Sequence, residues 1–454
     1  MNMERPTPRL VPSASRLKHR PPPPQPQAVV LDEGPELDPH WHKKRGEIGL
    51  QFAASFQEDS IAHVIRELAR ATWRLGYEVA VEQRETRGLG KASWPVTSIR
   101  HLRGQVRPPM CIIAWGTQNC GRDFFGTPRV FMDVPDSLHF ADAAQMHKYN
   151  HEGDLFLTVT DAALAEYQQA GLSVPGAVVP LGVDRNVFKP CDEKDMGLIL
   201  DADWHGEPPD DETWLVLLAG YMQPRKGVDL ALEAMKQVFG PENDVAILVK
   251  TVVGRWGRDI SEDVAASLND SGLRFGLLTE SLPEHQFARL LASADCYLAP
   301  HRREGFGLIP LQALACGTPV VTTRYDGPAT YLNEDNAVLI EPRGLECLPI
   351  RKSEDGRVLE VALNGEGGGD VDTWAVLDVD DIARAVERCH KEYGLVEEAR
   401  RIEAGLATAE EWSWERSAQC LVDALQAHIG PVRQRPQRLR WERTGLTIAV
   451  PARN

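Results

Sequence analysis

The residues best suited to chemistry lie in one stretch, EGFGLIPLQALACGTPVV, at positions 304–321. An apolar run precedes Glu304, and a short helical pattern follows Gly307 and stops at Gly317. Glycines at the start of a helix let a ligand approach the backbone N–H groups, and the helix dipole favours a phosphate there. Glycine in such a turn also has a purely steric explanation, so the prediction of an anion-binding turn depends on the whole string.

That string resembles the signature of the GT-B-fold retaining glycosyltransferases of the large family four, the glycosyl transferases group 1. Four further stretches resemble other segments of the family in the same order, at 179–188, 217–229, 323–332 and 409–416. Together they extend over about residues 45 to 430. Agreement in both residues and order argues against a chance match.

The resemblance assigns roles to the residues at matching positions. It implies that Glu304 contacts the donor sugar and that Lys226 holds the nucleotide diphosphate, where an ammonium stabilises charge developing on the leaving phosphate. These two are the expected catalytic residues. The other expected donor-binding residues are Gly220, Arg225, Gly305, Phe306, Gly307, Leu308 and Gln312.

The chain departs from the family pattern at two positions on the donor side. Gln312 stands where the family has a glutamate for the ribose hydroxyls, and Tyr221 stands where it usually has an arginine. An amide bonds a hydroxyl without charge assistance, which predicts weaker or altered nucleotide binding unless Gln312 only faces a helix neighbour. Arg225 either supplies the second cation or points to solvent. Both departures leave open an unusual donor or a non-catalytic copy of the fold.

The acceptor side is less clear from the sequence. Asp133 and His139 follow an apolar run and are possible contacts to the acceptor or the sugar, although an ordinary surface acid and an ordinary surface histidine are the simpler explanation of each. His301 stands where the family usually has a serine. It either reaches the donor phosphate or hydrogen-bonds a loop carbonyl.

These residues need two sheets to position them. Short apolar runs alternate with amphipathic segments, which predicts parallel sheets with helices on both faces. The expected strands are 48–52, 79–81, 111–115, 130–132, 155–159 and 178–180, then 214–219, 246–249, 273–275, 296–299, 319–322 and 337–340. The first expected helix has one apolar face made of Ile61, Val64, Ile65, Leu68, Thr72 and Leu75.

The predicted fold class is therefore α/β. The resemblance makes it GT-B, with two doubly wound Rossmann-like domains facing a central cleft. The expected segments are a flexible proline-rich leader at 1–44, an N-terminal acceptor-side domain at 45–195, a C-terminal nucleotide-sugar-binding domain at 212–400 with a loop insertion or hairpin near 343–373, a crossover helix at 408–428 and a basic tail at 431–454.

Charge and composition limit the possible partners. The net charge is −16, but residues 1–24 carry +4 and residues 431–454 carry +5, so the middle carries −25. An acidic body of this size repels nucleic acid. The basic tails are either solvated or in peripheral contact with an anionic membrane. No apolar run approaches the roughly 18 residues of a spanning helix, and no signal core is evident, so we expect a cytoplasmic protein.

The function that these features predict is transfer of a hexose from a nucleotide diphosphate sugar, the co-substrate, to a hydroxyl acceptor. The resemblance implies retention at the anomeric carbon. No metal and no permanently bound cofactor are expected, because the lysine and the helix dipole can stabilise the phosphates. The alternatives are a non-catalytic binding or scaffold protein of the same fold, or a phosphorylase or nucleotide-sugar isomerase.

Overall fold

The structure is a computed structural model, and it describes residues 48–54, 60–83, 97–98, 109–115, 127–135, 143–240, 242–252, 272–352, 358–361, 371–432, 437–440 and 447–450. The chain divides into two compact units. The N-terminal unit holds the described residues of 33–182 and 412–454 with residues 352 and 358, and the C-terminal unit holds those of 183–351 and 359–411. The predicted leader at 1–44 lies outside the described residues.

The N-terminal unit is built on a seven-stranded sheet with the order β3-β2-β1-β4-β5-β6-β7. Every strand pair in it is parallel. The strands are β1 (Ile48–Ala54), β2 (Val79–Gln83), β3 (Thr97–Ser98), β4 (Pro109–Trp115), β5 (Arg129–Met132), β6 (Leu155–Thr158) and β7 (Gly176–Val178), and the helices are α1 (Ser60–Arg74), α2 (Ala143–Glu152), α3 (Asp161–Gln169) and α11 (Trp414–His428). The first five strands expected from the apolar runs are confirmed, whereas the strand expected at 178–180 lies at Gly176–Val178 and β3 was not expected.

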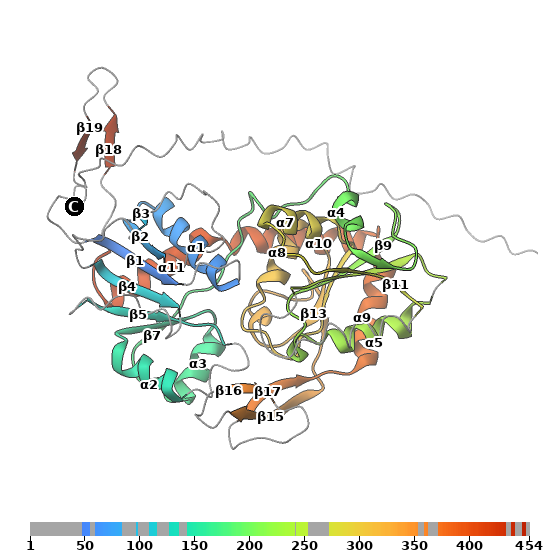
Figure 1. Ribbon diagram of the computed structural model, residues 1–454, viewed down its shortest axis with the longest axis horizontal. Helices are drawn as coiled ribbons and strands as arrows, with labels where there is room; N and C mark the ends of the chain where they lie inside the picture. Colours follow the sequence, from blue (N-terminus) through green and yellow to red (C-terminus); the bar gives the residue numbers. More distant parts are fainter. Residues whose placement is uncertain are drawn as a thin grey trace, which may run out of the picture. The chain divides into compact units, whose positions relative to one another are not determined.

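Helix α1 buries the middle of the face that its spacing predicts, but it ends at Arg74, and Leu75, expected on that face, is exposed. Helix α11 packs against α1 (Figure 1). Val64, Ile65 and Leu68 are buried, and the Thr72 hydroxyl donates a hydrogen bond to the Leu68 carbonyl at 2.7 Å. Helix α11 begins after Ser413, whose side chain caps it by accepting from the Arg416 N–H. A segment distant in sequence therefore completes the core of this unit.

The C-terminal unit has a second seven-stranded sheet with the order β14-β13-β12-β9-β10-β11-β8. All pairs are parallel except the edge pair of β8 with β11. The strands are β8 (Asp203–His205), β9 (Trp214–Ala219), β10 (Val245–Lys250), β11 (Arg274–Leu278), β12 (Cys296–Ala299), β13 (Val320–Thr323) and β14 (Val338–Ile340), and the helices are α4 (Met196–Leu200), α5 (Val228–Val238), α7 (Glu284–Ser293), α8 (Leu308–Cys316), α9 (Val379–Glu392) and α10 (Val396–Glu411). Each strand expected in the second series is present.

The strand order of this sheet reverses between β9 and β12. Strand β9 has β10 on one side and β12 on the other, so the chain moves outward through β10 and β11 and then crosses back to β12. In open α/β sheets, ligands bind outside the carboxyl ends of the strands at such a reversal. The loops that follow β9 and β12 are therefore the ones that the fold favours for a site.

A small antiparallel sheet occupies the predicted insertion and extends three residues beyond it, between β14 and α9 (Figure 1). It contains β15 (Gly344–Lys352), β16 (Val358–Val361) and β17 (Val371–Val376), and β15 pairs antiparallel with β17. Within the predicted basic tail, β18 (Gln437–Arg440) and β19 (Thr447–Val450) form an antiparallel pair. Among the helices of the described ranges, none is both long and apolar enough to cross a membrane.

Candidate functional site

The loops after β9 and β12 are held together by backbone hydrogen bonds. The Arg302 and Arg303 N–H groups both donate to the Arg225 carbonyl, at 2.7 and 3.3 Å. Gly227 permits this approach: it has a φ of +67°, and a Cβ there would lie 1.9 Å from the Pro300 carbonyl oxygen. A glycine at this position is therefore required by the path of both loops.

This contact brings together the charged residues that the sequence separates. The Lys226 ammonium forms an ion pair and hydrogen bond with the Glu304 carboxylate, and an Arg225 guanidinium nitrogen lies 3.6 Å from the same oxygen. All three side chains keep partial exposure, between 13% and 20%. One carboxylate and two cations thus lie at the sheet reversal and remain accessible to a ligand.

The electrostatic balance of this cluster keeps Glu304 ionised. Burial alone would raise its pKa, but the charges of Lys226 and Arg225 outweigh burial and lower the pKa of Glu304 to about 2. A carboxylate at neutral pH can accept hydrogen bonds from sugar hydroxyls, and the two cations can bind a diphosphate. Gly220 lies beside them, because a Cβ there would be 4.0 Å from Lys226 Cε.

The turn after Glu304 is fixed by the loop that follows β13. Asp326 accepts the Glu304 N–H at 3.1 Å and has a φ of +60°, and the Gly327 N–H donates to the Glu304 carbonyl at 2.9 Å. The Tyr331 hydroxyl donates to the carbonyl of Gly307. Backbone strain at Asp326 is consistent with a position whose geometry the surrounding structure imposes.

Helix α8 begins after Gly307, which has a φ of +85°, and ends at Gly317, as the signature predicts. Leu308 at its start is half-buried. Gly305 and Phe306 are buried, and the Phe306 ring packs at 5.4 Å from the ring of Tyr331. Gln312 is 4% exposed within the same helix. Donor contacts through these residues stay predictions.

His301 has the structural role that was one of its two expected alternatives. It is 2% exposed, with Nε2 3.0 Å from the Tyr325 carbonyl and Nδ1 3.2 Å from the Thr322 hydroxyl. Burial lowers the pKa of His301, so the ring is neutral. It joins the loop after β12 to the end of β13 and the loop that follows it.

We expect His301→Gln to reduce the loss of stability in mild acid. Because the pKa of the folded state is lowered, the unfolded state binds more protons below about pH 6.5, and stability falls as the pH drops through that value. Glutamine keeps a donor for the Tyr325 carbonyl and does not titrate. Thermal unfolding at about pH 7.5 and about pH 5.5 measures this difference. An equal decrease in thermal stability in the wild type and the variant would contradict this prediction. Burial also lowers the pKa of His390, but His390 is present in both proteins and contributes equally to each.

In the N-terminal unit, Asp133 is held in the core. Its carboxylate accepts hydrogen bonds from Tyr149, at 2.5 Å, and from Gln145, at 3.0 Å, both on α2. His139 lies outside the described residues.

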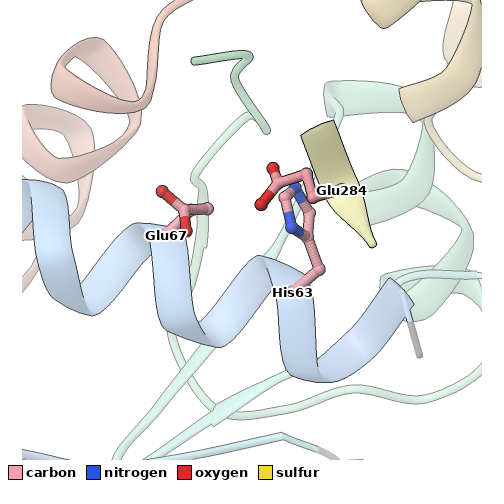
Figure 2. Close-up of side chains that lie close together, drawn as sticks. All are labelled: His63, Glu67 and Glu284. Carbon is pink, nitrogen blue, oxygen red and sulfur yellow. The ribbon is translucent and has the colours of Figure 1, made fainter. Parts of the chain in front are cut away.

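Figure 2 shows His63 and Glu67 projecting from the same side of α1. Glu67 accepts from Arg70 at 2.6 Å, and the His63 ring lies 5.8 Å from that of Trp414.

Two buried cations near the sheet edge were not singled out from the sequence. Lys250 ends β10, its ammonium donates to the Thr251 carbonyl at 2.9 Å, and burial lowers its pKa to about 8. Its own carbonyl accepts the Gly220 N–H at 3.0 Å. Arg303 is 2% exposed. The sequence signal that could have identified Lys250 is a lysine at the end of an apolar strand. No sequence signal points to Arg303.

Comparison with known proteins identifies a related region. Residues 203–346 match a protein-family model described as Glycosyl transferases group 1. The D-inositol 3-phosphate glycosyltransferase of Segniliparus rotundus is 32% identical over 167 residues, which cover 36% of this chain and 35% of that protein. The chain therefore matches about a third of the length of this curated relative. The resemblance predicted from the sequence is confirmed, and the matched residues include Lys226, Glu304 and Gln312.

Solved structures share the fold over a larger part of the chain. A sucrose-phosphate synthase from Thermosynechococcus elongatus has a TM-score of 0.60 at 14% identity and covers 83% of this chain and 98% of its own. Anabaena Alr3699/HepE, solved in complex with UDP and glucose, has a TM-score of 0.59 at 15% identity. The match covers 83% of this chain and 99% of that one. These likenesses confirm the expected GT-B fold class.

Proposed function

We propose that this chain, whose residues 203–346 match the glycosyl transferases group 1, is a glycosyltransferase that moves a hexose from a nucleotide diphosphate sugar to a hydroxyl acceptor with retention. The observation that carries the proposal is the cluster of Glu304, Lys226 and Arg225 at the reversal of the C-terminal sheet. It combines cations for a diphosphate with an ionised carboxylate for sugar hydroxyls. The relative named as a glycosyltransferase and the neighbour solved with UDP and glucose support it.

In this proposal, binding of the donor separates the ion pair between Lys226 and Glu304 and gives each side chain a new partner. The diphosphate attracts Lys226 and Arg225, and Glu304 then accepts hydrogen bonds from the sugar. As the bond between the anomeric carbon and the phosphate oxygen breaks, Lys226 stabilises the charge that develops on the phosphate. The acceptor oxygen bonds to the same face of the anomeric carbon, and its proton passes to the departing phosphate.

Titration calorimetry with uridine, guanosine and adenosine diphosphates tests the donor site, and transfer from the matching hexose donors tests the activity. We expect micromolar to millimolar binding of at least one nucleotide. Failure of every nucleotide to bind would contradict the transferase and support a non-catalytic scaffold. Turnover that requires inorganic phosphate would instead identify a phosphorylase.

Gln312→Glu is expected to tighten binding of the nucleoside diphosphate about five- to tenfold, because a hydrogen bond to a charged group is about 1 kcal/mol stronger than one between neutral groups. The same change lowers the melting temperature of the ligand-free protein, since position 312 is 4% exposed and a buried carboxylate is unfavourable. Calorimetry and thermal unfolding measure the two effects. Gln312→Leu serves as the control, and equal affinity in all three proteins would show that this side chain does not contact the nucleotide.

A further inference from the structure

Strand β17 of the small antiparallel sheet is hydrogen-bonded to the segment that leads into Glu304. The Ala375 N–H donates to the Arg302 carbonyl at 2.8 Å, and an Arg303 side-chain nitrogen donates to the Thr373 carbonyl at 3.4 Å. The inserted sheet is therefore joined to the site loop by both backbone and side chain.

A buried ion pair strengthens this junction. Arg303 is 2% exposed, Asp372 on β17 is 5% exposed, and Arg303 Nε lies 3.3 Å from an Asp372 carboxylate oxygen. The other carboxylate oxygen accepts the Trp374 indole N–H at 2.7 Å, and the Thr373 N–H donates to the first at 3.0 Å. Asp372 is thus oriented by its own strand so that it faces the arginine.

Arg303 also contacts the groups that hold the charged cluster. Its carbonyl accepts from Arg225 Nη1 at 3.3 Å, and its own Nη1 lies 3.9 Å from the Asp326 carboxylate. That carboxylate accepts the Glu304 N–H at 3.1 Å. A shift of Arg303 therefore moves Arg225 from one side and Glu304 from the other.

From these contacts we infer that strand β17 of the small sheet positions the donor-binding cluster, with Arg303 and Asp372 as positioning residues that hold Glu304 and Arg225 in the geometry the donor requires. The inference rests on the proposed function and extends it to residues outside the signature. Displacing a substrate-positioning group by about 1 Å can lower turnover about a hundredfold. A loss of turnover of this size in a variant that remains folded therefore distinguishes a positioning role from a contribution to stability alone.

The test compares Asp372→Asn, which keeps the side-chain shape and removes the charge, with Arg343→Gln. Arg343 stands just before β15 and pairs with Asp381 and Asp378, so the control removes an ion pair at the base of the same sheet that is exposed to solvent and does not contact the charged cluster. We measure kcat and KM with the donor that the wild type uses, affinity for its nucleoside diphosphate, and the melting temperature. The assays are run at a temperature at which all variants are folded.

We expect Asp372→Asn to lower kcat about ten- to a hundredfold and to weaken nucleotide binding, with Arg343→Gln equal to the wild type. Asp372→Glu, which restores the charge, recovers part of the activity. If Asp372→Asn does not fold, Trp374→Phe removes the indole donor that orients Asp372, together with part of a buried ring, and should show a smaller loss of kcat in the same direction.

Two failures are distinguishable. A wild type that binds no nucleoside diphosphate overturns the proposed function, and this inference with it. A wild type that binds and turns over, with folded Asp372 or Trp374 variants that differ only in melting temperature, overturns the positioning role and leaves the proposed function intact.

Discussion

Lys226→Ala is expected to lower the rate of sugar transfer by about a hundred- to a thousandfold, which is the usual effect of removing one group that stabilises developing charge. Lys226 and Glu304 lie within one ion pair at the carboxyl ends of β9 and β12, and loss of the lysine leaves Arg225 to bind the diphosphate beside Glu304. Glu304→Gln should lower the rate comparably, because the neutral amide neither pairs with Lys226 nor binds sugar hydroxyls with charge assistance. Steady-state kinetics with the preferred donor measures both effects.

The matched control for the lysine is Lys236→Ala on α5, where the ammonium lies 3.9 Å from Glu233. It removes the same side chain from a helix surface and should leave the rate unchanged. Full turnover in either site variant would refute its assigned role. A rate loss in the control as large as in Lys226→Ala would show that the measurement reports stability.

A second large effect is expected from Gly227→Ala, through the backbone. The new methyl group would lie 1.9 Å from the Pro300 carbonyl oxygen, so the loops after β9 and β12 must separate, and the φ of +67° adds strain. We expect a loss of at least about 3 kcal/mol in the free energy of unfolding, together with loss of nucleotide binding. Denaturant unfolding and calorimetry measure the two quantities.

Gly394→Ala is the control for the strain alone. Gly394 has a φ of +72°, and no atom of the described residues lies within 4 Å of the place a Cβ would take, so alanine there costs only the left-handed conformation, about 1 kcal/mol. Equal losses in the two variants would mean that the contact between the loops adds nothing to stability.

The proximity of Lys226 and Glu304 was predictable from the sequence. Each follows an apolar strand, and the carboxyl ends of parallel strands lie at the same edge of a sheet. The strand positions followed from apolar runs bounded by polar turns in the same way. The end of α8 at Gly317 followed from glycine's tolerance of a positive φ, which is +75° at that residue.

Side-chain partners from separate elements could not be predicted. Asp133 follows a strand as an acceptor contact would, yet Tyr149 on α2 donates to it in the core, and no sequence period relates the two residues. The pairing of Arg303 with Asp372 depends on how the insertion folds back, and its spacing in the chain has no characteristic pattern. Burial likewise decided the role of His301, which the residue type left open between two alternatives.

The packing of α11 against α1 has a consequence for the order of events during synthesis. Helix α1 is made early, whereas the helix that covers it begins at Trp414, after the whole C-terminal unit has been synthesised. Domains generally fold as units while the chain emerges. The C-terminal unit can therefore reach its native state first, and the surface of α1 that contacts α11 lacks this partner until α11 has been made.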